Sequence, residues 1–186
     1  NESIIAQRDI RVGDIVEVIR SGDVIPKVLG PDITARPAGL VPWEVPTHCP
    51  FCNTELVNPE GEVNRYCTNA ACPGRAFETL VHFTSRSWMN IAGLGPERIR
   101  LIIEAKLVSD PASFYRLSTA NVALLDGMAE RSAQQLIAAI DASRQLPLRD
   151  LLVALGIRHV GSSAAKALAR RFGNMATLRS ATVEEL

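Results

Sequence analysis

The sequence predicts a multidomain, mainly α-helical protein that also contains a few β-strands and a compact cysteine segment. Three observations predict this class: a run of β-branched residues near the N-terminus, four cysteines within 24 residues, and a helical pattern that repeats from residue 76 onward. These patterns divide the chain into parts at 1–45, 46–75 and 76–186. With 186 residues in all, one or two ordinary domains are expected, so the middle part is too short for a large core.

Composition limits the classes of function. Hydrophobic residues make up 47% of the chain, enough to bury a core, while no apolar run reaches membrane-spanning length. The formal net charge is zero, but residues 1–75 carry 7 basic and 10 acidic residues, and residues 76–186 carry 13 and 10. Of the 20 basic residues, 17 are arginine, which suits bidentate contacts to phosphate. The asymmetry fits an anionic partner of the C-terminal part, and a solvated surface explains it almost as well.

The N-terminal part is rich in β-formers. Between residues 10 and 28 they are separated by turn signals at Gly13-Asp14 and Ser21-Gly22-Asp23. We expect strands at about 14–20 and 23–29, with the second at an edge or bulge because Pro26 lacks a backbone N–H. Two strands are too few to be stable alone, which predicts partner strands upstream.

A proline-rich connector follows the strands. Residues 30–47 contain four prolines and Gly39, which favour an extended conformation. We expect at most one short strand there, near Trp43.

Four cysteines indicate a metal site. Cys49, Cys52, Cys67 and Cys72 are the only cysteines of the chain, with two residues inside the first pair and four inside the second. Two close pairs on a short loop can wrap one tetrahedral ion, as in structural zinc sites. Metal binding would then supply much of the folding energy of this segment. We predict one structural Zn²⁺ held by the four thiolates.

Other uses of the cysteines fit less well. A redox dithiol at Cys49-Pro50-Phe51-Cys52 would need a βαβ context, and two disulfides would imply an oxidising compartment, for which no signal-like stretch is present. His48 or His82 could replace a cysteine ligand, but four thiolates already fill a tetrahedral site. Between the outer cysteines lie three acidic residues and one basic residue, which favours a structural role over contact with an anion.

A turn of small residues occurs three times in the helical part. The turns are Ile91–Gly95, Leu125–Ala129 and Ile157–Gly161, and their starts are 34 and 32 residues apart. In each, a second apolar residue follows three positions after the first, and later apolar residues fall on one helical face. This pattern is the helix-hairpin-helix motif. The spacing predicts a fourth hairpin near residue 190, with Leu178–Leu186 as its first helix, so that the array would be truncated in its fourth repeat.

Such a turn suits a DNA phosphate. Small residues permit close approach, while unpaired N–H groups and the dipole of the following helix attract an anion. Contacts to the DNA backbone carry no base information, so binding would be largely independent of sequence. The candidate turn residues are Gly93, Gly95, Gly127, Ala129, His159 and Gly161, and the candidate side chains near them are Arg98, Arg131, Arg158, Ser162, Ser163 and Lys166.

Helical packing is the alternative explanation of these turns. Gly127 or Gly161 alone could be a helix C-cap, and repeats of 34 residues also occur in tetratricopeptide arrays. The second and third turns are degenerate, because Ala129 and His159 stand where the first turn has glycine. Three turns in near-constant register favour the hairpin interpretation.

The order of these parts resembles the C-terminal half of bacterial NAD-dependent DNA ligases. Arg11–Pro31 looks like the end of that family's OB-fold domain, Asn1-Glu2 looks like the stretch before it, and Leu152–Gly173 looks like its third hairpin. The cysteine spacing is similar to that of the ligase zinc finger. The resemblance implies a C-terminal part of an OB-fold domain at 1–45, a four-cysteine zinc finger at 46–75 and a helix-hairpin-helix domain at 76–186. Departures from the pattern are Ser21, where alanine is usual, and Trp88-Met89-Asn90 before the first hairpin.

The resemblance implies the DNA-binding portion of an enzyme that seals 5′-phosphate/3′-hydroxyl nicks in replication and repair. The parent would use NAD and Mg outside this segment, and the Lys-x-Asp-Gly motif that accepts AMP is absent here, so the segment alone is expected to be inactive. Its implied partner is nicked duplex DNA, bound without sequence preference by a monomer in the bacterial cytoplasm, at the nucleoid, and with no membrane. Arg20 and Lys27 on the strands are further candidates for DNA contact.

Two other functions stay open at this stage. One is a zinc-stabilised protein-interaction scaffold in which the helices serve only as packing elements. The other is a nuclease or repair-enzyme domain that uses the same hairpins. Against the latter stand the order of strands and cysteines and the absence of a carboxylate cluster with two-metal spacing from the sequence.

Overall fold

Two antiparallel strands, β1 (Val16–Ser21) and β2 (Ile25–Pro31), form the N-terminal sheet. The computed structural model describes residues 2–186, apart from the side chain of Asp23, and divides into two units, Asn1–Asn69 and Ala70–Leu186. Both expected strands are present, each about two residues later than predicted. Since the sheet has only two strands, Pro26 lies on an edge as expected, while the bulge falls between Glu17 and Val18 instead.

Little apolar surface is buried in the first unit. The exposed apolar residues include Val12, Ile15, Val24 and Ile25, and Cys49 is the one buried hydrophobic residue among the described residues up to 69. A short helix that the sequence analysis missed, α1 (Glu2–Gln7), precedes the sheet. Its six residues are too few to show a helical period.

Arginine and aspartate side chains hold the connector against the start of the chain. Arg36 pairs with Asp14 at 2.8 Å and with Asp9 at 2.7 Å, and Arg11 pairs with Asp9 at 2.9 Å. The Asp14 side chain is fully buried and Arg36 is 13% exposed. This network substitutes for the core that the first unit lacks.

The connector does not form the short strand considered near Trp43. The connector holds only a 3-10 turn, η2 (Ile33–Ala35), and residues 36–47 have no strand. Pro42 and Pro46 flank this position and cannot donate to a strand ladder. Strand pairing resumes in the cysteine segment, where β3 (Leu56–Val57) pairs with β4 (Tyr66–Cys67).

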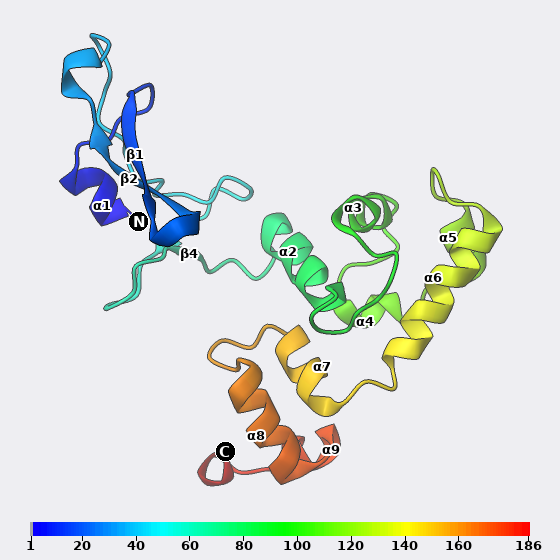
Figure 1. The fold of residues 1–186 in the computed structure, drawn as a ribbon. Coiled ribbons are helices and arrows are strands. Elements are labelled where there is room, and N and C mark those ends of the chain that lie inside the picture. Colours follow the sequence, from blue (N-terminus) through cyan, green and yellow to red (C-terminus); the bar gives the residue numbers. More distant parts are fainter. Residues whose placement is uncertain (1) are drawn as a thin grey trace. The chain divides into compact units, whose positions relative to one another are not determined.

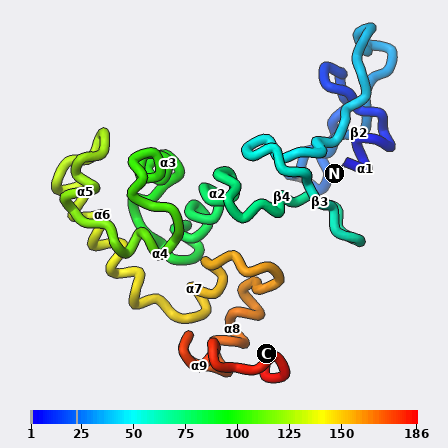
Figure 2. The backbone as a smooth tube through the Cα atoms, turned by 180° about the vertical axis from the view of Figure 1, so that it is seen from behind, coloured from blue at the N-terminus to red at the C-terminus, as the bar shows by residue number. Residues whose placement is uncertain are grey.

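The second unit is helical, as the repeating pattern predicted (Figure 1 and Figure 2). Its first helix begins at a proline in the first turn, where the missing N–H costs nothing. The helices are α2 (Pro73–Thr84), α3 (Pro96–Glu104), α4 (Pro111–Phe114), α5 (Thr119–Ala123), α6 (Glu130–Ser143), α7 (Leu148–Ala154), α8 (Ser162–Phe172) and α9 (Met175–Arg179). No helix in the described part of the chain is long and apolar enough to cross a membrane.

Two hydrophobic clusters organise the helical unit. The larger one gathers buried residues from α2 to α7, among them Phe83, Ile99 and Phe114. The smaller one joins α7 to α8 through Leu152, Val153 and Ala165. Trp88 packs against both clusters, so the unusual residue before the first hairpin connects the two halves of this unit.

The prediction of a single helix at Leu178–Leu186 is wrong. Helix α9 ends at Arg179, and a separate 3-10 turn, η3 (Val183–Glu185), begins after Thr182. The Thr182 N–H donates to the Glu185 carboxylate at 2.8 Å, which is a capping box that starts a new helical segment. The hairpin expected near residue 190 lies beyond the sequence and stays a prediction.

Candidate metal centre and nucleic-acid interface

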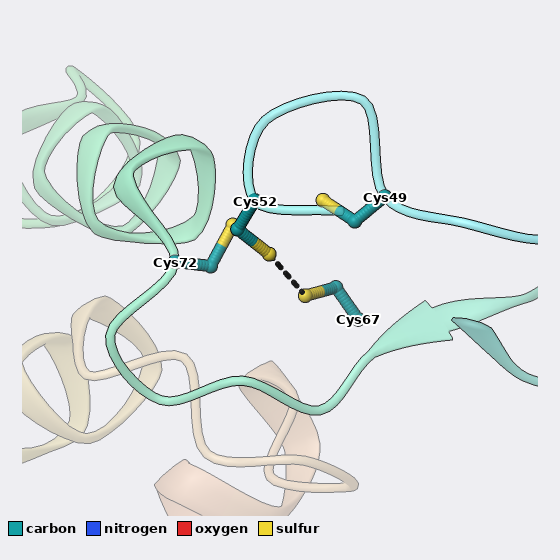
Figure 3. A group of neighbouring side chains, drawn as sticks. All are labelled: Cys49, Cys52, Cys67 and Cys72. Atoms are coloured by element: carbon teal, nitrogen blue, oxygen red, sulfur yellow. Dashed lines mark hydrogen bonds between the residues drawn. The ribbon is translucent and has the colours of Figure 1, made fainter. Parts of the chain in front are cut away.

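The four cysteines meet at one point. Cys49 and Cys52 lie on one loop, Cys67 ends β4, and Cys72 immediately precedes α2 (Figure 3). Their sulfur atoms all lie within 4.8 Å of one another, and the Sγ atoms of Cys52 and Cys67 are 3.5 Å apart. Zn–S bonds of about 2.3 Å in a tetrahedron place sulfur atoms about 3.8 Å apart. The group therefore has the size of a closed four-thiolate site.

A tight turn brings the first two cysteines together. The Cys49 N–H donates to the Thr54 carbonyl at 2.8 Å, and the Asn53 N–H donates to the Cys49 carbonyl at 2.9 Å. Asn53 adopts a positive φ of 56°, a conformation that asparagine tolerates better than most residues. In Figure 3 the Cys52 side chain at the end of this loop points toward Cys67.

The surroundings of Cys52 favour its thiolate form. Hydrogen bonds from Thr54 lower the pKa of Cys52 to about 6, with a smaller contribution from Asn69. Cysteine binds metal as a thiolate, so the lowered pKa of Cys52 favours metal binding. Thr54 and Asn69 were not among the residues predicted from the sequence, although a short hydroxyl residue two positions after a C-x-x-C pair is a usable signal.

Neither histidine considered as a ligand belongs to the described cysteine group. The His48 ring lies 2.9 Å from the Thr47 hydroxyl, and His82 Nε2 lies 2.9 Å from the Val153 carbonyl. None of the four cysteines forms a disulfide.

The three hairpins share one backbone conformation. In each, the N–H of the fourth residue donates to the carbonyl of the first, at 3.2, 3.0 and 3.0 Å. The third residue has a positive φ in every case: 89° at Gly93, 69° at Gly127 and 67° at His159. This is the pattern of a type II turn. The third hairpin is therefore degenerate in sequence but not in backbone shape.

Each hairpin leads into a helix whose N-terminus has no side-chain cap. The N-cap residues Gly95, Ala129 and Gly161 all have extended backbone angles and are exposed. Since no side chain caps these helices, N–H groups of the first turn stay available to an outside acceptor. The helices that follow have 9, 14 and 11 residues, long enough to have an appreciable dipole.

Charge distinguishes the hairpins from one another. The second has Asp126 in the turn and Glu130 at the helix start, both unfavourable to an anion. The third has Arg158 in the turn, hydroxyl residues at the helix start and Lys166 one turn on. Of the three, the third hairpin has the most favourable charge for a phosphate.

Hairpins one and two line a shared hollow of about 400 Å³. Gly93 and Gly95 contribute from the first, and Gly127 and Met128 from the second. Arg98 also lines it, and its Nη1 donates to the Gly93 carbonyl at 2.7 Å. Thus Arg98 is engaged within its own hairpin, a role that sequence spacing does not indicate. Three of the predicted turn residues meet in this hollow, whereas His159 and Gly161 belong to the third hairpin.

Comparison with known protein families is consistent with both sites. Residues 48–73 match the model of the NAD-dependent DNA ligase C4 zinc finger domain. Residues 86–142 match a SAM-like helix-hairpin-helix tandem, and residues 150–186 match a helix-hairpin-helix motif. The tandem model spans the first two hairpins, and the other spans the third.

Similar proteins cover the whole chain. It is 45% identical to a DNA ligase of Gemmatimonas aurantiaca, 44% identical to one of Desulforudis audaxviator and 48% identical to one of Heliobacterium modesticaldum, each over 186 residues. The chain spans 27% of the length of the first and 28% of the other two. The chain is thus similar along its whole length to segments of DNA ligases, and its cysteine segment matches the zinc finger domain of NAD-dependent ligases.

Proposed function

We propose that this chain is the DNA-binding portion of a ligase that seals 5′-phosphate/3′-hydroxyl nicks in duplex DNA during replication and repair. The observation that carries the proposal is the threefold recurrence of one turn geometry before an uncapped helix N-terminus. Backbone amides at such positions bind phosphates whatever the base sequence. This explains how a chain of zero net charge can hold a polyanion.

The three hairpins are proposed to contact DNA phosphates, each with a different contribution to the binding affinity. The turn amides around Gly93, Gly95, Gly127, Ala129, His159 and Gly161 would approach the phosphates. Arg131, Arg158, Lys166 and the hydroxyls of Ser162 and Ser163 would add contacts at the rims. The charge distribution gives the third hairpin the largest share and the second the smallest.

The four cysteines would hold one structural zinc ion. A closed four-thiolate site leaves no position for substrate, so the metal would serve folding and not chemistry. Two of the sulfur atoms, those of Cys49 and Cys72, belong to buried residues, which also favours a structural role.

Chemistry is assigned to parts of the parent enzyme outside this segment. The sequence has no Lys-x-Asp-Gly motif, so we expect no transfer of AMP from NAD to this chain. NAD and Mg would bind elsewhere in the parent. The segment would act as a monomer in the bacterial cytoplasm, in contact with the nucleoid.

A binding titration tests the proposal. Fluorescence anisotropy with nicked and intact duplexes should show binding at low salt that weakens as salt rises, with equal affinity for duplexes of different sequence. Incubation with labelled NAD should leave the chain unlabelled. Lack of duplex binding at low salt would favour the scaffold function, and covalent AMP labelling would contradict the assignment of chemistry to other parts.

A further inference from the structure

A basic hollow lies between α7 and α8. It has a volume of about 500 Å³, and its lining includes Arg149 from α7 together with Lys166 and Arg170 from α8. The rest of its lining is uncharged and includes Leu148 and Ala169. The two helices that form it are packed together through the smaller hydrophobic cluster.

The charges of this hollow are available to a ligand. Lys166 and Arg170 are exposed, and no described carboxylate pairs with either of them. Arg149 is 52% exposed and lies 3.4 Å from the Asp150 carboxylate, a surface ion pair of the kind that contributes little. Asp150 does not line the hollow. Three cations thus face one space without an acidic group in its lining.

Its position relates the hollow to the third hairpin. Helix α8 begins at Ser162, directly after that hairpin. At about 1.5 Å per residue, Lys166 lies about 6 Å and Arg170 about 12 Å further along the helix axis. A DNA strand presents a phosphate about every 3.4 Å of duplex axis. A duplex at the hairpin therefore has other phosphates within reach of the hollow.

We propose that this hollow binds a second backbone phosphate of a duplex held at the third hairpin. The two guanidinium groups match the oxygen geometry of a phosphate, and the ammonium group adds a point charge. This inference rests on the proposed function, because it assumes that DNA binds at the hairpin. It extends the phosphate contacts by two residues, Arg149 and Arg170, that do not belong to any hairpin.

Adjacent arginines on α8 provide a matched test. Arg170 lines the hollow, whereas Arg171 does not and instead lies over the Phe172 ring at 5.4 Å. Arg170→Gln and Arg171→Gln remove the same charge at nearly the same place. We expect Arg170→Gln to weaken duplex binding about tenfold and to reduce the slope of log K against log salt by about 0.9. Arg171→Gln should leave that slope close to the wild-type value.

The outcomes separate the two proposals. If the wild-type chain fails to bind duplex at low salt, the proposed function fails. If the wild type binds and the two variants show the same affinity and slope, the hollow is not a phosphate site and the proposed function stands. Thermal unfolding of each variant verifies that its fold is retained, and Arg149→Gln provides a second measurement from the opposite wall.

Discussion

Arg98 donates a hydrogen bond to the Gly93 carbonyl at 2.7 Å, so the first hairpin is held by a side chain of the helix that follows it. A Cβ atom added at Gly93 would lie only 3.0 Å from the Arg98 Nη1 atom. Nothing lies within 4 Å of a Cβ at Gly127, the same position of the second hairpin. The two glycines thus share a backbone conformation but differ in their surroundings.

Gly93→Ala should destabilise the chain more than Gly127→Ala. Both substitutions place alanine in the left-handed region, at a cost of about 1–2 kcal/mol. Gly93→Ala also disturbs the Arg98 hydrogen bond, which adds about 1 kcal/mol. Denaturant unfolding of both variants measures the difference. Equal free energies of unfolding would show that the Arg98 contact contributes nothing.

His159→Val should destabilise the third hairpin, whereas His159→Gly should not. His159 has a φ of 67°, which glycine adopts freely and a β-branched residue adopts at a cost of about 1–2 kcal/mol. Thermal unfolding of the two variants gives the comparison. A loss of stability in His159→Gly larger than in His159→Val would mean that the imidazole side chain itself, and not the backbone angle, matters there.

Gly161→Val should weaken DNA binding without affecting the fold. Gly161 has extended backbone angles that valine accepts, and a Cβ there meets nothing within 4 Å, so the added side chain would occupy the approach of a phosphate. We expect a loss of affinity of about tenfold in anisotropy titrations. The matched control is Ala129→Val, at the same position of the acidic second hairpin, where the loss should be smaller. An equal loss at both positions would contradict the ranking of the hairpins by charge.

Acid should loosen the first unit. Hydrogen bonds from Arg11 and Arg36 lower the pKa of Asp9 to about 2, and the bond from Arg36 lowers the pKa of Asp14. Both carboxylates have ordinary pKa values near 3.8, so their stabilisation is complete above that pH. It is lost as the pH falls through the lowered pKa of each group, which is about 2 for Asp9. Hydrogen exchange of residues 9–40 measured between pH 5 and pH 2 tests this.

Arg36→Gln is the variant for that experiment. It should lower protection of residues 9–40 already at pH 5 and flatten the dependence on pH below 4, because Asp14 loses its main partner and Asp9 loses one of its two arginine partners. Arg20→Gln, a change of the same charge on β1, is the control and should keep the wild-type dependence. A wild-type profile in Arg36→Gln would contradict the role of the network.

Removal of metal should unfold the cysteine segment selectively. Metal analysis should find about one zinc ion per chain, and Cys67→Ser should lose it. Hydrogen exchange of residues 46–75 should then rise sharply, while the core around Phe83 and Ile99 stays protected. Val63→Ser, an exposed position of the same segment, is the control. Full protection of residues 46–75 in metal-free protein would show that the segment folds without an ion.

Sequence patterns predicted the parts of the fold that depend on local chemistry. Apolar spacing located all three hairpins, and cysteine spacing located the four sulfur atoms that the structure brings together. The pairing of Arg36 with Asp14 could not be predicted, because the residues are 22 positions apart and nothing local relates them.

The errors have physical causes as well. Pro42 and Pro46, on either side of Trp43, lack the N–H donors that a strand needs. Thr182 begins a new helical segment where apolar spacing alone predicted one continuous helix. The third turn looked irregular in the sequence, because histidine stands where the other two turns have glycine. Its backbone nevertheless has the same positive φ at that position. The hollow between α7 and α8 depends on how two helices pack, which a motif does not encode.

Trp88 restricts movement of the third hairpin relative to the other two. It packs against both clusters, and His82 Nε2 lies 2.9 Å from the carbonyl of Val153 on α7, so the third hairpin cannot swing away without breaking these contacts. The spacing between the hairpins is therefore set when the chain folds. A duplex bound at one hairpin would find the other hairpins already in position. The entropy cost of ordering them would then be met on folding and would not weaken DNA binding. If the chain binds DNA as proposed, the array would therefore act as a rigid surface with fixed distances between its phosphate contacts.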